Sequence, residues 1–381
     1  MKKSIIAVAG AAAVALTLAA CGTAPESGSG SSETPTDTAS ETADGGETET
    51  GGGEAVEGFK ACMVSDAGGF DDQSFNQSGK EGLDKAASEL GVEVKAIESR
   101  DDSEYGPNID SLISDGCTYI IGVGFLLEPA IQAAGRANPD LHFGLIDSAL
   151  SNPDDFSTVE LDNVKPLLFN TAEAAFLAGY AAAGMSESGK VGTFGGLPIP
   201  SVTIFMDGFA DGIKQYNEDN GKAVELIGWD KDTQEGSFTG DFDDQSKGQD
   251  TTQGFLDQGV DIVMPVAGPV GLGAASALQA ANGTMVWVDS DGFNSTSYGD
   301  IILTSVMKEI GQAVFDSVKA SSEGSFSAEP YVGTLENGGV GIAPWHDFES
   351  KVPAELTQKI DEYKQKIISG ELKVESPSTP S

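Results

Sequence analysis

Short apolar runs alternate with amphipathic helical patterns through most of the chain, beginning near residue 59. Each run is followed by Gly, Asp or Ser, as buried strands are when they stop at the loop edge of a sheet. This alternation predicts a parallel sheet with right-handed crossovers. In this first series the predicted strands are 61–64, 92–97, 119–123, 143–146 and 158–161, and the predicted helices are 77–90, 105–115 and 128–137.

A second series of the same kind begins with a long helical pattern. Two such series predict an α/β fold with two doubly wound lobes, whose ligands bind outside the carboxyl ends of the strands. We therefore expect the functional site in the cleft between the two carboxyl edges. In this series the predicted strands are 190–194, 224–229, 261–266, 285–288, 301–303 and 331–334, and the predicted helices are 169–185, 202–216, 246–258, 271–281, 306–320 and 353–369.

The late segments of the chain are expected to cross back between the lobes. A folded part of about 310 residues is large enough for two lobes with their own cores. The first lobe is predicted to comprise 59–163 plus 304–325, and the second lobe 164–303 plus 326–370. The Ser- and Pro-rich tail at 371–381 is expected to be disordered.

The N-terminal segment has the pattern of an export signal. Two lysines precede an uncharged run at 5–20 that is too short for a comfortable membrane span. The letters LAACG follow and resemble a bacterial lipobox, in which the signal peptide, 1–20, is removed and the thiol of Cys21 is acylated. Acyl chains such as palmitate would hold the mature N-terminus at a membrane, at ~0.8 kcal/mol per buried methylene. The alternative is an ordinary secretory signal with an incidental cysteine.

The next segment, 21–58, predicts a disordered acidic tether. Residues 22–58 hold nine carboxylates and no Lys or Arg, with no aromatic side chain. Such a segment buries too little apolar surface to offset chain entropy. We therefore expect a folded body that is held off the extracytoplasmic face of the cell membrane by a lipid-anchored tether. The alternative is a low-complexity terminal segment that has no function.

The charge of the chain argues against one class of partner, and its cysteines permit one disulfide. The chain has 21 Lys+Arg against 60 Asp+Glu, a formal charge of −39, so nucleic acid is excluded as a partner. Apart from Cys21, the cysteines are Cys62 and Cys117. An even pair in an exported protein permits one disulfide, and the starts of adjacent strands lie within disulfide range. Two small buried hydrophobic side chains are the alternative.

The junction after the first strand carries the richest chemistry, in the letters SDAGGFDDQSFNQ. Its two glycines permit a tight turn, and Asp72 and Ser74 are candidate helix caps. Phe75 and Asn76 then lie at the helix N-terminus, facing the cleft. An aromatic ring beside an amide suits a heteroaromatic base, by stacking and by hydrogen bonds to one edge. The alternative is a core phenylalanine and a second cap.

This junction resembles the first motif of the basic membrane protein family, which comprises substrate-binding lipoproteins of ABC importers. Further blocks of similarity follow in the family's order, through about residue 320. The resemblance implies a two-lobed periplasmic-binding-protein-like fold of type I. It also implies that the chain captures a nucleoside, with a purine favoured, and delivers it to an ABC permease and its ATPase. The blocks are SDAGGFDDQSFNQS (65–78), GVGFLL (122–127), GLID (144–147), FLAGYAA (176–182), GKVGTFGG (189–196), DGFADGIK (207–214), FDDQSKGQ (242–249), VAGPVGLG (266–273) and LTSVMK (303–308).

The resemblance also implies roles for individual residues. The rings of Phe75 and Phe242 would sandwich the base. Asn76 and Asp147 would form hydrogen bonds with its edge. Gly268, Asp289 and Lys308 would hold the ribose. Asp66 would lie on the rim of the same site. Phe238 competes with Phe242 for the second ring, although the letters F-x-D-x-x-K-G favour Phe242. The family often has Gln at the position of Gly292.

Other functions fit the sequence less well. The chain has two histidines and no Ser/His/Asp or Cys/His pattern at strand ends, so we expect no enzyme and no cofactor. Two acidic stretches, 230–234 and 289–291, resemble fragments of a calcium loop but lack its Gly and Glu, so we expect no metal site. A sugar receptor of the same fold and a surface antigen or adhesion lipoprotein remain alternatives. The receptor is expected to be a monomer.

Overall fold

Residues 58–152 and 157–380 are described by a computed structural model. The predicted signal peptide, the lipidation site at Cys21 and nearly all of the tether lie outside the described residues. Within the described part of the chain, no helix is long and apolar enough to cross a membrane.

The first sheet contains six strands in the order β13-β5-β4-β3-β1-β2, and all neighbouring pairs are parallel. Two of its helices pack closely, because Gly82 on α1 faces Gly311 on α9. A Cβ at Gly82 would lie 2.2 Å from the Gly311 carbonyl oxygen. The elements of this lobe are β1 (Lys60–Val64), α1 (Phe75–Leu90), β2 (Glu93–Ile97), α2 (Tyr105–Ser114), β3 (Tyr119–Val123), α3 (Glu128–Ala137), β4 (His142–Ile146), β5 (Val164–Phe169), α9 (Ile310–Ser322) and β13 (Tyr331–Gly333).

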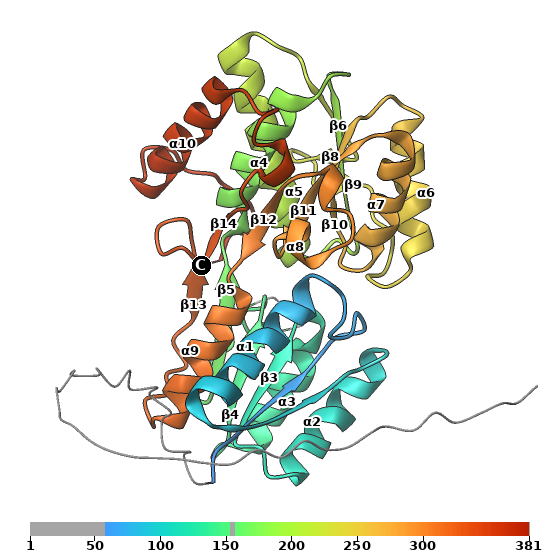
Figure 1. Ribbon diagram of the computed structural model, residues 1–381. Coiled ribbons are helices and arrows are strands. Elements are labelled where there is room, and N and C mark those ends of the chain that lie inside the picture. The colour runs from blue at the N-terminus through green and yellow to red at the C-terminus, as the bar shows by residue number, and fades with distance from the viewer. Residues whose placement is uncertain (1–57, 153–156, 381) are drawn as a thin grey trace, which may run out of the picture. The chain divides into compact units, whose positions relative to one another are not determined.

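The second sheet also contains six strands, in the order β14-β12-β11-β10-β6-β7. Its strands are parallel except β14, which runs antiparallel to β12. Figure 1 shows both sheets with their helices. The elements are α4 (Thr171–Met185), β6 (Lys190–Gly195), α5 (Pro200–Asn220), β7 (Glu225–Ile227), α6 (Gln245–Leu256), β10 (Ile262–Val266), α7 (Val270–Ala281), β11 (Thr284–Asp289), α8 (Gly292–Ser295), β12 (Ile302–Lys308), β14 (Val340–Ile342) and α10 (Ala354–Ile368), with a small hairpin of β8 (Trp229–Asp230) and β9 (Glu235–Gly236).

The expected α/β architecture with two parallel-sheet lobes is therefore confirmed. The chain passes between the sheets three times: after β5, between β12 and β13, and between β13 and β14. The parallel arrangement places the carboxyl ends of the strands at one edge of each sheet.

The boundary of the first lobe differs from the expected one at residue 163. Strand β5 pairs with β4 in the first sheet, so 164–169 belong to this lobe. The predicted strand at 158–161 is wrong, because only a single bridge joins Ser151 and Thr158 there. Lys165 and Pro166 interrupt the apolar run of β5, and Pro is unusual inside a sheet. The strand therefore looked like a loop in the sequence.

The second expected boundary, at residue 304, also differs. The predicted helix at 306–320 begins too early, since 306–308 complete β12 in the second sheet. Helix α9 starts at Ile310 and packs on α1 of the first lobe. The strand β13 then lies in the first sheet, although 326–370 was assigned to the second lobe. Apolar residues on both sides of this junction hide the change from strand to helix.

The segment after α10 differs from the expected disordered tail. The structure describes it through residue 380, and Val374 is 7% exposed within a hydrophobic core cluster. The serines that suggested disorder make hydrogen bonds to α5 instead, including Ser376 to Asp207 and Ser378 to Thr203.

The two cysteines of the first lobe form a disulfide. Cys62 and Cys117 have Cα atoms 6.0 Å apart, and both side chains are buried. Cys62 lies in β1 and Cys117 just before β3, its neighbour in the sheet. Pairing of these strands therefore brings the cysteines together, as strand adjacency predicted.

Candidate functional site

A pocket lies between side chains of both lobes at the carboxyl ends of the strands. It encloses about 550 Å³ of space free of protein atoms, its open mouth included. Eight of its lining residues are those that the sequence singled out. They are Asp66, Phe75, Asn76, Asp147, Phe242, Gly268, Asp289 and Lys308.

The strand ends explain why these residues meet. Asp66 follows β1 closely and Asp147 directly follows β4, while Asp289 and Lys308 are the last residues of β11 and β12. Gly268 follows β10 at φ +51°, a conformation that favours glycine. The doubly wound topology therefore collects polar groups from chain positions more than 200 residues apart.

Lys308 forms the electrostatic centre of the pocket. Its ammonium contacts the carboxylate of Asp147 and lies 3.3 Å from Asp289 Oδ1, and all three side chains are less than a tenth exposed. Burial lowers the pKa of Lys308, but the two carboxylates outweigh it, so its pKa is raised and the ammonium stays charged. Burial raises the pKa of Asp147, against the attraction of Lys308.

The two carboxylates beside Lys308 share an unusual backbone conformation. Asp147 has φ +62° and Asp289 has φ +69°, in the left-handed region that non-glycine residues rarely adopt. Such a conformation costs about 1–3 kcal/mol and is concentrated at functional sites. Both residues turn the chain directly at a strand end, which aims each carboxylate at Lys308.

A second polar network fixes the rim of the pocket. The amide nitrogen of Asn76 donates to Asp66 Oδ1 at 2.7 Å and to Asp72 Oδ2 at 3.1 Å, and its oxygen accepts from the Asp66 backbone N–H at 3.3 Å. Burial raises the pKa of Asp66 to about 6. The other oxygen of Asp66, Oδ2, faces Gly124, where a Cβ would lie 3.1 Å away. Asn76 thus holds Asp66 at the pocket wall.

Asp72 was expected as a cap of the helix that follows, and it is one. Its carboxylate accepts backbone N–H bonds from Ser74, Asn76 and Gln77 at 2.8–3.0 Å. Burial raises its pKa against these hydrogen bonds. Asp72 also lines the pocket, although its oxygens serve the start of α1.

The two carboxylate oxygens of Asp289 have different surroundings. Its Oδ2 accepts from the Ser74 hydroxyl at 3.2 Å, whereas its buried Oδ1 has no hydrogen-bond partner among the described residues. The Lys308 ammonium forms an ion pair with this oxygen at 3.3 Å. A buried acceptor without a partner costs free energy, which a hydroxyl-bearing ligand would recover.

Aromatic side chains from both lobes line the pocket. Phe75 belongs to the first turn of α1, and Phe242 precedes α6 in the second lobe. Phe242 packs against Gly196, where a Cβ would lie 2.3 Å from its ring. Phe238 instead stacks edge-to-face on Trp229, 6.0 Å between ring centroids, and is not among the lining residues. The geometry therefore favours Phe242 as the second ring.

The start of α5 contributes residues that sequence reasoning missed. Ser201, Val202 and Phe205 line the pocket, and the Phe205 ring centroid lies 4.9 Å from the Lys308 ammonium, at cation–π distance. These residues follow the letters GGLPIP after β6. This glycine-rich strand end was a usable signal, because corresponding strand ends in the first lobe also carry pocket residues.

Direct hydrogen bonds join the lobes beside the pocket. The Ser74 hydroxyl donates to the Val288 carbonyl at 3.0 Å, and the Ser290 hydroxyl donates to the Gln73 carbonyl at 3.0 Å. Ser74 and Gln73 belong to the first lobe, whereas Val288 lies in β11 of the second lobe and Ser290 directly follows that strand. The structure therefore has the lobes in contact at one side of the pocket.

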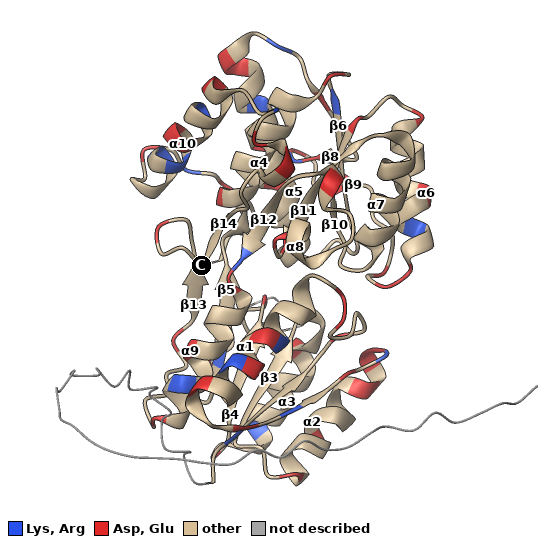
Figure 2. Ribbon diagram, viewed as in Figure 1, with Lys and Arg blue, Asp and Glu red and all other residues tan. Residues whose placement is uncertain are grey.

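The charged side chains of the pocket limit which ligands it can bind. Four carboxylates and one ammonium line the pocket, in a chain with 60 Asp+Glu against 21 Lys+Arg. Figure 2 shows both kinds of charge on the described part of the chain. Hydrogen-bond donors on a ligand are therefore favoured over anionic groups. Among residues 58–152 and 157–380, no group of three or more His, Cys, Asp or Glu side chains is placed to hold a metal ion.

Comparisons with known proteins identify the family and the fold. The ABC transporter nucleoside-binding protein BmpA of Lactococcus lactis is 30% identical over 84% of this chain and 89% of its own length. A CD4+ T-cell-stimulating antigen of Listeria innocua is 27% identical over 86% of this chain and 91% of its own length. The crystal structure of an ABC transporter solute-binding protein from Aeropyrum pernix K1 has a TM-score of 0.74 at 27% identity, covering 84% of this chain and 94% of that one.

A family model covers nearly all of the described residues. It matches 59–378 and describes PnrA-like substrate-binding proteins of ABC transporters. The expected resemblance to the basic membrane protein family is thereby confirmed. The chain belongs to the family of PnrA-like ABC transporter substrate-binding proteins.

Proposed function

We propose that this protein is an extracytoplasmic receptor that binds a nucleoside, with a purine favoured, and delivers it to an ABC importer. The observation that carries this proposal is that two aromatic rings line one pocket together with the Asp289 carboxylate, whose buried Oδ1 lacks a hydrogen-bond partner among the described residues. Aromatic rings stack on bases, and carboxylates accept hydrogen bonds from hydroxyl and N–H groups. The name of the Lactococcus relative supports the same ligand class.

In this proposal, Phe75 and Phe242 contact the two faces of the base. Asp66 and Asp147 accept from donors on its edge, with Asn76 beside them. Asp289 accepts from the ribose hydroxyls, and Lys308 neutralises part of the surrounding negative charge. An anionic phosphate is disfavoured here, because it would meet four carboxylates.

The proposed location follows from the N-terminal sequence. Acylation at Cys21 would anchor the protein on the outer face of the cell membrane, and the acidic tether would let the lobes reach a permease. The receptor binds its solute without converting it. The Listeria relative is named an antigen, so a surface-antigen role is the second candidate. An antigen role alone does not require the pocket.

A thermal-shift and calorimetric screen of residues 59–381 tests the ligand class. The panel contains nucleosides, free bases, sugars, amino acids and nucleoside monophosphates. A ligand bound only to the folded state stabilises it by about 2.7 kcal/mol at a hundredfold excess over Kd. We expect purine nucleosides to raise the melting temperature and free sugars to leave it unchanged. A shift with a sugar or an amino acid and none with any nucleoside would overturn the proposal.

A further inference from the structure

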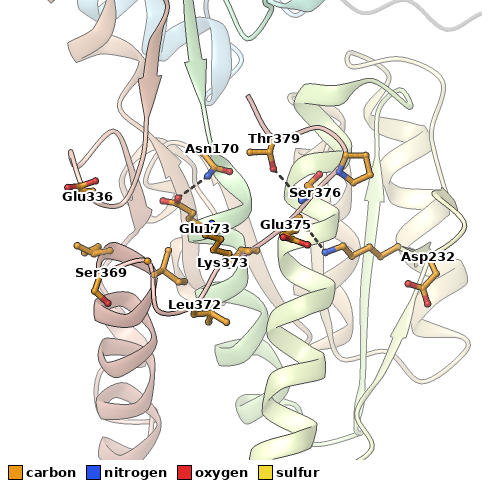
Figure 3. Close-up of a pocket in the computed structure, with 16 residues that line it drawn as sticks. Asn170, Glu173, Asp232, Glu336, Ser369, Leu372, Lys373, Glu375, Ser376 and Thr379 are labelled. Atoms are coloured by element: carbon orange, nitrogen blue, oxygen red, sulfur yellow. Dashed lines mark hydrogen bonds between the residues drawn. The ribbon is translucent and has the colours of Figure 1, made fainter. Parts of the chain in front are cut away.

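Residues 371–380, called the strap below, pack along the second lobe. Figure 3 shows the strap leaving α10, passing Leu372 and Lys373, and continuing to Ser376 and Thr379. The buried side chain of Val374 anchors it in a hydrophobic core cluster. The strap therefore belongs to the folded lobe.

The strap is bound to one side of α5 at three successive turns. Thr203 Oγ1 lies 2.8 Å from the Ser378 hydroxyl, and Asp207 Oδ2 accepts from the Ser376 hydroxyl at 2.6 Å. One turn further, Asp211 accepts from Lys231, whose ammonium also contacts the carbonyl of Glu375. The spacing of four residues places Thr203, Asp207 and Asp211 on one helix side. The strap thus follows α5 in a fixed register.

The central contact completes a buried carboxylate. Asp207 is 0% exposed, and its Oδ1 accepts from the Trp229 indole at 3.0 Å and from the Gln234 amide at 2.9 Å. The Ser376 hydroxyl supplies the donor to Oδ2. Removing that donor would leave a buried acceptor unpaired, which is more costly than losing an exposed hydrogen bond.

The helix that the strap binds also forms part of the pocket. Ser201, Val202 and Phe205 of α5 line it, and Phe205 lies against Lys308. An axial shift of α5 would therefore move Phe205 relative to the Lys308 ammonium. Helices pack through interlocking side chains, so such shifts occur between discrete arrangements and not continuously.

The far end of the strap reaches a cavity beside the ligand pocket. Residues 377–380 line this cavity together with Phe125, Asp147 and Ser201, which also line the ligand pocket. The strap is therefore linked to the ligand pocket in two ways. It contacts α5, which lines the pocket, and it lines a cavity that has residues in common with the pocket.

We propose that the strap is a positioning element for ligand binding, in which the Ser376–Asp207 hydrogen bond holds α5 in the register that the pocket requires. This inference rests on the proposed nucleoside-binding function. The strap contacts no ligand itself. It acts by keeping Phe205 and the start of α5 in place, so its loss weakens binding of every ligand of the pocket.

Ser376→Ala tests this role, with Ser376→Thr as the conservative variant and Ser322→Ala as the matched control. Ser322 is half-buried in the last turn of α9, away from the strap, and its hydroxyl donates to the local carbonyl of Lys319. We expect Ser376→Ala to raise the Kd for the best purine nucleoside about fivefold, a coupling at the low end for linked sites. Ser376→Thr keeps the hydroxyl and should restore most of the affinity. Equal affinity of Ser376→Ala and wild type would overturn the role.

Hydrogen exchange of the wild-type protein provides a second, independent test. Coupling is reciprocal, so a bound nucleoside must slow amide exchange in residues 374–380 if the strap supports the pocket. Unchanged exchange there, with the nucleoside bound, would overturn the inference even if Ser376→Ala failed to fold. A wild-type protein that binds no nucleoside would instead refute the proposed function, and this inference with it.

Discussion

At the scale of single residues, the pocket contains a carboxyl group that is costly to ionise. Burial raises the pKa of Asp66 to about 6, from 3.8 in an unfolded chain. The folded state therefore holds this proton more tightly than the unfolded state between these two values. The cost of the buried charge is absent below about pH 4 and fully present above about pH 6.

Asp66→Asn should accordingly stabilise the free protein at pH 7. Asparagine keeps an oxygen for the Asn76 and Gly68 donors but carries no charge. We expect a gain of about 1–3 kcal/mol at pH 7 in urea denaturation, shrinking as the pH is lowered to 4. The same gain at both pH values would show that the charge of Asp66 is not its cause.

The proposed ribose contact predicts a difference between two ligands. Asp289→Ala should weaken binding of a purine nucleoside by about 1.5–3 kcal/mol, because a charged acceptor for hydroxyl groups is lost. The 2′,3′-dideoxy analogue lacks those hydroxyls and should lose much less. Calorimetry with both ligands measures the contrast. Asp291→Ala is the matched control, since Asp291 caps α8 outside the pocket. Equal losses for both ligands would reduce Asp289 to a structural role.

Alanine substitutions of Phe242 and Phe238, the two candidates for the second stacking ring, should have different effects. Phe242→Ala should weaken nucleoside binding by about 1–3 kcal/mol, the usual range for a base stacked on an aromatic side chain. Phe238→Ala removes the contact with Trp229 and should lower the melting temperature of the free protein with little loss of affinity. Affinity and free-protein melting measured on both variants separate the two roles. A larger affinity loss in Phe238→Ala would reverse the assignment.

Much of the pocket was predictable from sequence because polar residues at strand ends meet in this topology. The family resemblance identified Asp147, Asp289 and Lys308. Strand-end reasoning alone would have missed Lys308, because the sequence predicted a helix at 306–320 where β12 ends. Phe205 was missed, because an apolar residue in a helical pattern reads as core. The orientation of Asn76 was not predictable either. Its amide is held by Asp66 and Asp72 together, and only the folded backbone brings these carboxylates to it.

At the scale of elements, the disulfide joins two neighbouring strands of the first sheet. Cys62 and Cys117 are separated by 55 residues, a loop that includes β2 and α2. Closing such a loop restricts the unfolded chain, a stabilisation of about 2–4 kcal/mol for typical disulfides.

We therefore expect the double variant Cys62→Ser, Cys117→Ser to lower the free energy of unfolding by about this amount while leaving nucleoside affinity unchanged. Both sulfurs lie outside the pocket residues. Urea denaturation of the wild type with and without reductant provides the control, since reduction should reproduce the effect. A changed affinity at unchanged stability would contradict the structural role of this disulfide.

The sequence located most strands and helices, but it misplaced elements at the lobe crossings. Strand β5 was missed because Lys165 and Pro166 break its apolar run, while its neighbours β4 and β13 supply the pairing. The end of β12 was read as helix because Val306 and Met307 fit either pattern. In both places, pairing with neighbouring strands determines the structure, although the local sequence pattern favours a loop or a helix.

At the scale of the whole molecule, anchoring and ligand capture are proposed to be separate functions. Cys21→Ala should leave the precursor uncleaved or release the protein from the membrane, because no acyl chain can be attached. Nucleoside affinity should not change, since the acidic tether separates Cys21 from the lobes. Membrane fractionation and calorimetry on the same variant measure the two properties. Membrane retention at the wild-type level would contradict the lipobox.

The three crossings between the sheets also bear on how the chain acquires its structure. The edge strand β13 pairs with β5, so that Tyr331 meets Leu167, and α9 packs on α1 across a still longer stretch of sequence. The first lobe therefore lacks an edge strand and a covering helix until most of the chain is available. Contacts this far apart in sequence slow folding, because loop closure must precede them.

During synthesis, a nascent chain that ends before residue 310 lacks both α9 and β13, and so exposes the unpaired edge of β5 and the side of α1 that α9 covers. Such surfaces pair readily with other chains and promote aggregation. The first lobe is therefore complete only after α9 and β13 have been synthesised. Fragments cut at either lobe boundary would be left with an open sheet edge.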